Sequence, residues 1–294
     1  MLRSWTRVIS WVCLCFALTW STTAILGNVN LVIVGALCML IPGLTSLFLC
    51  RYFWQEDLVG TLALRPQLNR YILVAWLLPL ILILSSILLS SLLPGVELLT
   101  NSMSIIDHME DRLPKDSIEK LRTEAQSLPL HPILLGVLLG MLSGLTINCL
   151  AACGEEIGWR GFLHRELRPL GFWQCSFLTG SIWGLWHAPL ILKGLNYPDH
   201  RYLGLLMMVV FCVLLAPLHH FLRERSRSVW APSIFHGTIN GLAGLTIVMV
   251  KGGSDLTVGF TGLAGFLSLL AANILLALHM SRQDYALSKE KGSI

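Results

Sequence analysis

The sequence predicts an all-α membrane protein with eight transmembrane helices, and three observations support this prediction. Of the 294 residues, 54% are hydrophobic and only 13% are charged, whereas an average soluble domain carries about 25% charged residues. The mean hydropathy is +0.69. The apolar residues also gather into runs of about 20 residues, the length that a helix needs to cross a bilayer. Residues 1–294 are therefore expected to form a single polytopic membrane domain.

Eight such runs follow one another along the chain, with the approximate bounds 8–27, 29–50, 71–93, 133–153, 172–192, 202–222, 229–250 and 259–280. The first run follows Arg3 and Arg7, as in a signal peptide. It is longer than the apolar core of such peptides, so we expect an uncleaved first span. The fourth, fifth and seventh runs carry Glu, His or Asn within the span or at its end.

The basic residues predict the orientation in the membrane. About two thirds of the 21 Lys and Arg residues fall on the side that would hold both termini. The side richer in basic residues faces the cytoplasm. Trp5, Trp54, Trp173 and Trp230 lie near the same interface, as aromatic anchors do. We therefore expect a multi-pass protein of the plasma or inner membrane with both termini in the cytoplasm.

Residues 95–131 form the one sizeable polar region, between the third and fourth runs. Ile106, Met109 and Leu113 recur there at helical spacing among acidic residues. This pattern indicates one or two amphipathic helices lying on the outer face of the membrane. Both a lid and a simple solvated loop are compatible with it.

The cysteines and the net charge exclude some classes of function. The eight cysteines lie in apolar stretches, so we interpret them as packing residues. Cys149 and Cys153 share a helix face, but no second pair or nearby histidine completes a zinc set. The net charge of +4 is spread over short loops. This distribution argues against a nucleic-acid partner.

The first polar cluster is the segment Gly-Glu-Glu-Ile-Gly-Trp-Arg that ends at Arg160. On a helix, Glu156 and Arg160 are four residues apart with the acid first, the better order for an ion pair. Glu155 points about 100° away, toward a different neighbour. Glu155 therefore stays available for a role other than this ion pair. The competing interpretation is that both acids are solvated at a helix end.

Two more clusters lie on later spans. His187 follows an aromatic stretch, and Pro189 should kink its helix nearby. His236 and Asn240 are four residues apart and share one helix face. The glycines of that span would let a neighbouring backbone come close. They are Gly237, Gly241 and Gly244. Each cluster alone could also be packing or interhelical hydrogen bonding.

Together these spans carry Glu155, His187, His236 and Asn240 in apolar surroundings. Ionisable groups inside a bilayer are costly and indicate a functional site. The least costly arrangement gathers the four in one intramembrane cavity, which we expect to open to the cytoplasmic side. A carboxylate, two imidazoles and a carboxamide can activate a water molecule and hold a developing oxyanion.

The motifs on these spans resemble the CAAX-protease and bacteriocin-processing (CPBP, or Abi) family of intramembrane proteases. That family shows EExxxR on one span, FxxxH on a later one, and HxxxN or HxxxD on another. Glu155, Glu156 and Arg160 match the first element in full. The resemblance covers residues 150–245, which we identify as the catalytic core spans.

The second and third elements match with one exchange. Trp183 and His187 stand where the family has Phe and His, and His236 with Asn240 matches the third element. The exchange of Phe for Trp concerns pocket shape more than chemistry, since every acid, base and donor position is filled.

The resemblance implies a catalytic set. It would make Glu155 the general base on a water shared with His187, with His236 and Asn240 binding the water, a metal ion or the oxyanion. Glu156 and Arg160 would support the site, and Trp159 and Trp183 would line the pocket. The resemblance leaves the cofactor open between zinc and no metal. If a metal ion is present, its expected ligands are Glu155, His187, His236 and Asn240.

The resemblance further implies a membrane-associated or lipidated peptide or protein as the substrate, in contact with membrane lipids. Two other functions stay open. A non-catalytic scaffold or immunity protein of the same family would bind a membrane partner without cleaving it. A proton-coupled transporter would use the same ionisable residues as a relay, although the sequence shows no internal repeat of the kind common in transporters. The oligomeric state is not encoded in any pattern found.

Overall fold

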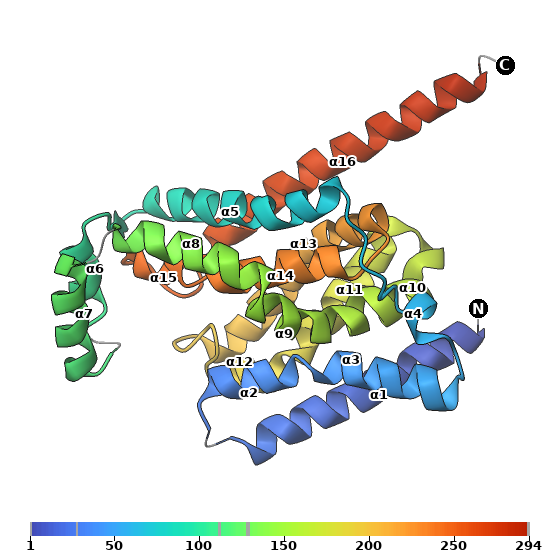
Figure 1. Cartoon of the computed structure of the whole chain (residues 1–294), viewed down its shortest axis with the longest axis horizontal. Helices are drawn as coiled ribbons and strands as arrows, with labels where there is room; N and C mark the ends of the chain where they lie inside the picture. Colours follow the sequence, from blue (N-terminus) through green and yellow to red (C-terminus); the bar gives the residue numbers. More distant parts are fainter. Residues whose placement is uncertain (1, 28, 111–112, 128–129, 293–294) are drawn as a thin grey trace.

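The structure is a computed structural model that describes residues 2–27, 29–110, 113–127 and 130–292, about three quarters of them helical (Figure 1). The first half contains α1 (Leu2–Ile25), α2 (Leu31–Cys38), α3 (Ile41–Phe48), the π-helix η1 (Leu49–Phe53), α4 (Leu58–Thr61), α5 (Arg70–Ser91), α6 (Ser102–His108), α7 (Lys115–Ser127) and α8 (Pro132–Leu145). The second half contains α9 (Ile147–Glu156), the π-helix η2 (Ile157–Leu163), α10 (His164–Leu167), the 3₁₀ helix η3 (Arg168–Leu170), α11 (Phe172–Trp186), α12 (Ala188–Leu192), α13 (Arg201–Ser226), α14 (Trp230–Leu242), α15 (Leu245–Val248) and α16 (Leu263–Gly292).

Two short strands tie distant loops together. Strand β1 (Glu97–Leu98) pairs antiparallel with β2 (Val250–Lys251), with Glu97 opposite Lys251. Helices α6 and α7 follow β1, and Figure 1 shows them standing beside one end of the bundle. One or two helices were predicted for this polar region, and the structure has two, with Ile106 and Ile118 buried. Their place on the outer face stays a prediction.

Five helices of the described residues are long and apolar enough to cross a membrane. They cover Trp5–Ile25, Leu31–Phe53, Arg70–Ser91, Arg201–Ser226 and Leu263–Arg282. A sixth span results if the bent pair Pro132–Leu145 and Ile147–Leu170, which meet at 48°, is taken as one. Six of the predicted runs therefore have a matching helix or helix pair, and the count of eight is not confirmed.

The other two predicted runs, 172–192 and 229–250, form helices too short to qualify by length. The first is interrupted where α11 ends at Trp186 and α12 begins at Ala188, with Pro189 at the start of α12. Proline lacks an N–H and cannot continue the preceding helix, so the expected kink is present. The second is divided between α14 and the four-residue α15.

Helix α14 lies inside the bundle, where α5, α8 and α9 pack around it. Glycine makes this close packing possible; the sequence predicted it at three glycines, and the structure confirms it at two of them. A Cβ atom on Gly237 would lie 2.6 Å from the backbone nitrogen of Cys149, and one on Gly241 would lie 2.4 Å from the carbonyl of Gly140. Gly244 has open space instead, with no atom within 4 Å of such a Cβ.

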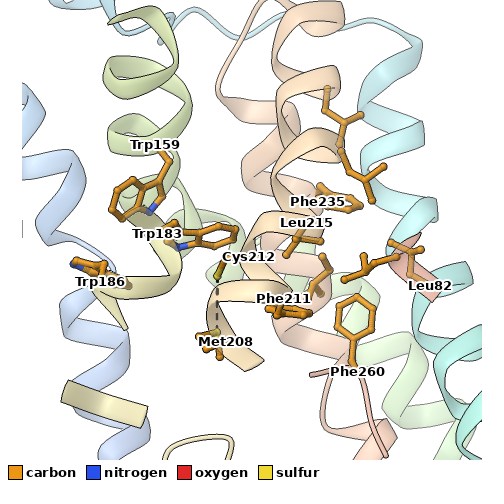
Figure 2. Close-up of a cluster of buried hydrophobic side chains, with 14 of the residues drawn as sticks. Leu82, Trp159, Trp183, Trp186, Met208, Phe211, Cys212, Leu215, Phe235 and Phe260 are labelled. Atoms are coloured by element: carbon orange, nitrogen blue, oxygen red, sulfur yellow. Dashed lines mark hydrogen bonds between the residues drawn. The ribbon is translucent and has the colours of Figure 1, made fainter. Parts of the chain in front are cut away.

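Large apolar side chains fill the space between these helices. Figure 2 shows Trp159, Trp183 and Trp186 grouped on one side of the core and Phe235 with Phe260 on the other. All five are 2% exposed or less. Burying an aromatic side chain of this kind contributes about 1.5–3 kcal/mol each. The polar residues described next are therefore held in a rigid apolar frame.

Candidate functional site

The polar site begins where α9 becomes a π-helix. Glu155 and Glu156 are the last two residues of α9, and η2 continues from Ile157 through Arg160. Short π-helical segments widen the helix by one residue per turn and often occur at functional sites. All three charged side chains are buried, with exposed fractions of 2% or less. They are therefore not a solvated helix end, which was the competing interpretation of the sequence.

Glu156 is the central acceptor of the site. Its Oε1 accepts a hydrogen bond from Nη1 of Arg160 at 3.1 Å and lies 2.9 Å from Nδ1 of His236. Nε2 of His219 is 3.7 Å away. The ion pair with Arg160 was expected from the four-residue spacing, whereas the contact with His236 was not. Buried charges persist only with such partners.

Glu155 faces a different set of neighbours. Its Oε2 accepts hydrogen bonds from the indole Nε1 atoms of Trp183 at 2.7 Å and Trp159 at 3.0 Å. Among the described residues, Oε1 of Glu155 has no hydrogen-bond partner. The two carboxylates thus diverge as predicted. Oε2 of Glu156 is likewise without a hydrogen-bond partner among the described residues, so the carboxylates differ in their partners: Glu155 meets neutral indoles, and Glu156 meets the Arg160 guanidinium.

The hydrogen bonds of two histidines fix their proton positions. Nδ1 of His187 lies 2.9 Å from the backbone carbonyl of Trp183, which can only accept, so Nδ1 carries the hydrogen. In His236 the carboxylate of Glu156 has the same effect on Nδ1. A neutral imidazole protonated at Nδ1 presents a lone pair at Nε2. Both histidines can therefore accept a hydrogen bond from a water or substrate.

Trp183 contacts both Glu155 and the residues that surround Glu156. Its ring lies under Arg160, whose Cζ is 4.4 Å from the ring centroid, and it packs edge-on against His219 and His236. Cation–π contacts of this kind are worth about 2 kcal/mol when desolvated. Trp183 therefore positions the Glu155 carboxylate as well as lining the pocket. That role goes beyond the pocket-shape effect expected from the exchange of Phe for Trp.

Sequence reasoning missed His219 on α13. It is fully buried, and its Nδ1 lies 3.1 Å from the carbonyl of Leu215. The sequence contains a signal that could have revealed it, because two adjacent histidines inside an otherwise apolar span need polar partners. His220, the second of the pair, faces another cluster described below.

The four residues expected to meet in one cavity are only partly brought together. Glu155, His187 and His236 surround Trp183, but no hydrogen bond among the described residues joins Glu155 directly to either histidine. Asn240 lies one turn beyond His236 on α14 and is exposed. Glu155, His187 and His236 therefore lie around one tryptophan ring, and the place of Asn240 in the site stays a prediction.

The carboxylates and imidazoles of the site are possible ligands of a metal ion. Within the described residues, Glu155 and His187 belong to no group of three or more His, Cys, Asp or Glu ligands within 4.8 Å, whereas Glu156, His219 and His236 form one. That group already holds the fully buried guanidinium of Arg160 on the same carboxylate oxygen that its histidines face. A dication there would lie against this positive charge. These residues do not fit a metal centre.

Comparison with known proteins gives one family match. Residues 136–242 match the family described as "Type II CAAX prenyl endopeptidase Rce1-like". The match begins in α8 and ends at the last residue of α14. It thus includes every residue of the site described above.

One curated relative is also similar. It is "CAAX prenyl protease 2" of the archaeon Methanococcus maripaludis, 43% identical over 49 residues, or 16% of this chain. The matched stretch spans only 18% of the relative's length.

Proposed function

We propose that this chain, which belongs to the CPBP family through residues 136–242, is an intramembrane endopeptidase with Glu155 as the general base. The substrate would be a membrane-associated or lipidated peptide or protein. The observation that carries the proposal is the asymmetry of the two buried carboxylates. Glu156 is engaged by the guanidinium of Arg160 and the ring of His236, whereas Glu155 accepts hydrogen bonds from two neutral indoles and is held by no cation among the described residues.

The proposed reaction begins with a water molecule held between Oε1 of Glu155 and Nε2 of His187. Glu155 takes a proton from this water as its oxygen attacks the carbonyl carbon of the scissile peptide bond. Asn240 donates hydrogen bonds to the oxyanion that develops, and the proton then passes from Glu155 to the leaving amine. General acid–base catalysis of this kind contributes about 10²–10⁴-fold to the rate.

Glu156 and Arg160 support this machinery. A carboxylate at Nδ1 orients the ring of a catalytic histidine and stabilises its imidazolium form. Glu156 would do so for His236, which could then also donate to the oxyanion. No step of this proposal uses a metal ion, and zinc participation is tested by a chelator in the experiment below.

The proposed membrane arrangement has all eight helical runs crossing or entering the bilayer. In it, α11 with α12 and α14 with α15 are broken spans enclosed by the longer helices. Broken helices are tolerated at membrane depth when protein surrounds them or they line a water-filled cavity. The cavity would open to the cytoplasm, where both termini would lie, in the plasma or inner membrane.

The deciding experiment is cleavage by the purified full-length protein. A panel of fluorogenic peptides, with and without a C-terminal prenyl group, is incubated with wild type, Glu155→Gln and Glu155→Ala, each with and without chelator. We expect cleavage that both substitutions reduce by at least about 10²-fold and that the chelator leaves intact. Glu110→Gln, in the exposed helical region, is the matched control.

Two outcomes overturn the proposal. Cleavage by Glu155→Ala at the wild-type rate would remove Glu155 from catalysis. A correctly folded wild type that cleaves no peptide but binds one equally well with and without Glu155 would instead identify a non-catalytic scaffold. Loss of cleavage with chelator in Cys175→Ala as well as in wild type would keep Glu155 as the base but make the route zinc-dependent, because this variant lacks the thiol of the second polar cluster described below.

A further inference from the structure

A second cluster of polar residues lies beside the proposed active site, on a face of α13 about 100° around the helix from His219. Its members are His164 of α10, Cys175 of α11 and His220 of α13, which are 4%, 1% and 0% exposed. One nitrogen or sulfur atom of each lies within 4.8 Å of the others. The proposed hydrolysis uses none of the three.

The geometry points to a three-ligand zinc site formed by His164, Cys175 and His220. One cysteine with two histidines is a donor set that zinc accepts. Zinc–sulfur and zinc–nitrogen bonds of about 2.3 and 2.0–2.1 Å at tetrahedral angles place the sulfur and nitrogen about 3.6 Å apart. Sγ of Cys175 is 3.6 Å from Nδ1 of His164. These two ligand atoms therefore already have the spacing of a tetrahedral site.

Nε2 of His220 is an independent indication of a ligand. This atom is buried and has no hydrogen-bond partner within the part of the chain that the structure describes. Nδ1 of the same ring is held by Oγ of Ser176 at 2.9 Å. Buried polar atoms without partners are uncommon in proteins, and a histidine with one nitrogen fixed presents the other as a metal ligand. A bound cation would satisfy Nε2.

The groups that contact the other nitrogen of each histidine ring are also of the kind found at metal sites. If Nδ1 of His164 binds the ion, its Nε2 faces Oε1 of Glu224 at 3.6 Å. A carboxylate behind a histidine ligand and a hydroxyl behind another orient metal-binding rings in this way. The arginines whose charges act on these histidines are Arg160, Arg168 and Arg223. Each has a partner outside the cluster: Arg160 pairs with Glu156, Arg168 pairs with Glu224, and Arg223 donates to the carbonyl of Arg160.

An ion could reach this cluster from water. The side chains of Glu224 and Arg168 are 32% and 72% exposed, so the cluster lies beneath an accessible surface. Three protein ligands leave the fourth zinc position to a water molecule. A bound ion would join α10, α11 and α13, the last two of which carry Trp183 and His219. The site would therefore stabilise the helices that position the catalytic residues.

Metal content of the full-length protein in detergent tests this proposal. After zinc loading and removal of free ion, we expect about one zinc ion per chain that Cys175→Ala and Cys175→Ser abolish. Ser176→Ala should weaken zinc binding by about 10–100-fold, as loss of an outer partner does. This substitution keeps all three ligands, so it separates binding from gross misfolding.

Cobalt replacement identifies the ligating sulfur. A thiolate-to-cobalt charge-transfer band should appear in wild type, vanish in Cys175→Ser and persist in Cys153→Ala, a matched buried cysteine on α9. Equal zinc content in wild type and folded Cys175→Ser overturns the proposal, and so does loss of the band in Cys153→Ala instead. Glu155→Gln should keep both zinc and band, so failure of the protease proposal and failure of this one give different results.

Discussion

The indole nitrogen of Trp183 lies 2.7 Å from Oε2 of Glu155, and this hydrogen bond connects α11 to the end of α9. Phenylalanine, which stands at this place in the resembling pattern, has no hydrogen to donate. In this chain the exchanged residue therefore contacts the proposed base directly. It leaves the opposite oxygen of Glu155 as the one that can meet a water molecule.

Trp183→Phe should therefore reduce the rate of cleavage while leaving substrate affinity nearly unchanged. A hydrogen bond to a charged group contributes about 1.5–3 kcal/mol, which corresponds to roughly 10–100-fold in rate. The measurement is kcat and KM on the best peptide of the panel. Trp173→Phe, at an exposed position of the same helix, is the control and should keep the wild-type kcat. An equal loss in both variants would contradict the role given to Trp183.

Glu156→Gln should destabilise the protein more than Glu155→Gln. Glu156 neutralises the fully buried Arg160 at 3.1 Å, and breaking a buried ion pair costs about 3–5 kcal/mol because one charge is left uncompensated. Glu155 bonds only to neutral indoles, which can also donate to an amide oxygen. Thermal unfolding midpoints in detergent report the difference. Similar midpoints for the two variants would show that Arg160 does not depend on Glu156.

Gly237→Ala should disrupt the packing of α14 against α9, whereas Gly244→Ala should be tolerated. The added methyl group would lie 2.6 Å from the backbone nitrogen of Cys149 in the first case and in open space in the second. The backbone of a helix cannot move at one residue without repacking its neighbours. The added methyl group should therefore lower the free energy of unfolding by about 1–3 kcal/mol. Unfolding midpoints and cleavage rates of the two variants provide the check. The prediction is wrong if Gly244→Ala proves the more harmful change.

Glu56 should make stability depend on acid pH. Burial favours its neutral form, but the ion pairs with Arg7 at 2.8 Å and Arg165 at 3.0 Å prevail and lower the pKa of Glu56 below its usual range. A lowered pKa contributes stability above about pH 4.3, the ordinary glutamate value. This contribution is lost as the pH falls through the folded-state pKa.

The measurement compares unfolding midpoints of wild type and Glu56→Gln from about pH 6 down to pH 3, a range that brackets the ordinary glutamate pKa. Wild type should be the more stable protein at the upper end, and the gap should shrink as the pH falls. Glu119→Gln, at an exposed position of α7, should follow wild type throughout. A gap that stays constant with pH would exclude Glu56 as its source.

Sequence patterns predicted the helical membrane architecture because the length and apolarity of a span are local properties of the chain. Six of the eight runs have a matching long helix or bent pair. The break after His187 followed from Pro189, and the Glu156–Arg160 pair followed from four-residue spacing. These features depend on neighbours within one helix.

The partners across helices were decided by the tertiary structure alone. Spacing along the chain does not say which of two adjacent carboxylates a distant side chain will meet, and His236 meets Glu156 and not Glu155. Likewise, it does not reveal that Trp183 donates to Glu155 or that His164, Cys175 and His220 converge. The sequence alone determined which residues are too polar for their apolar surroundings. Packing of α9, α11, α13 and α14 decided how those residues satisfy one another, because the low-dielectric interior penalises every buried group left without a partner.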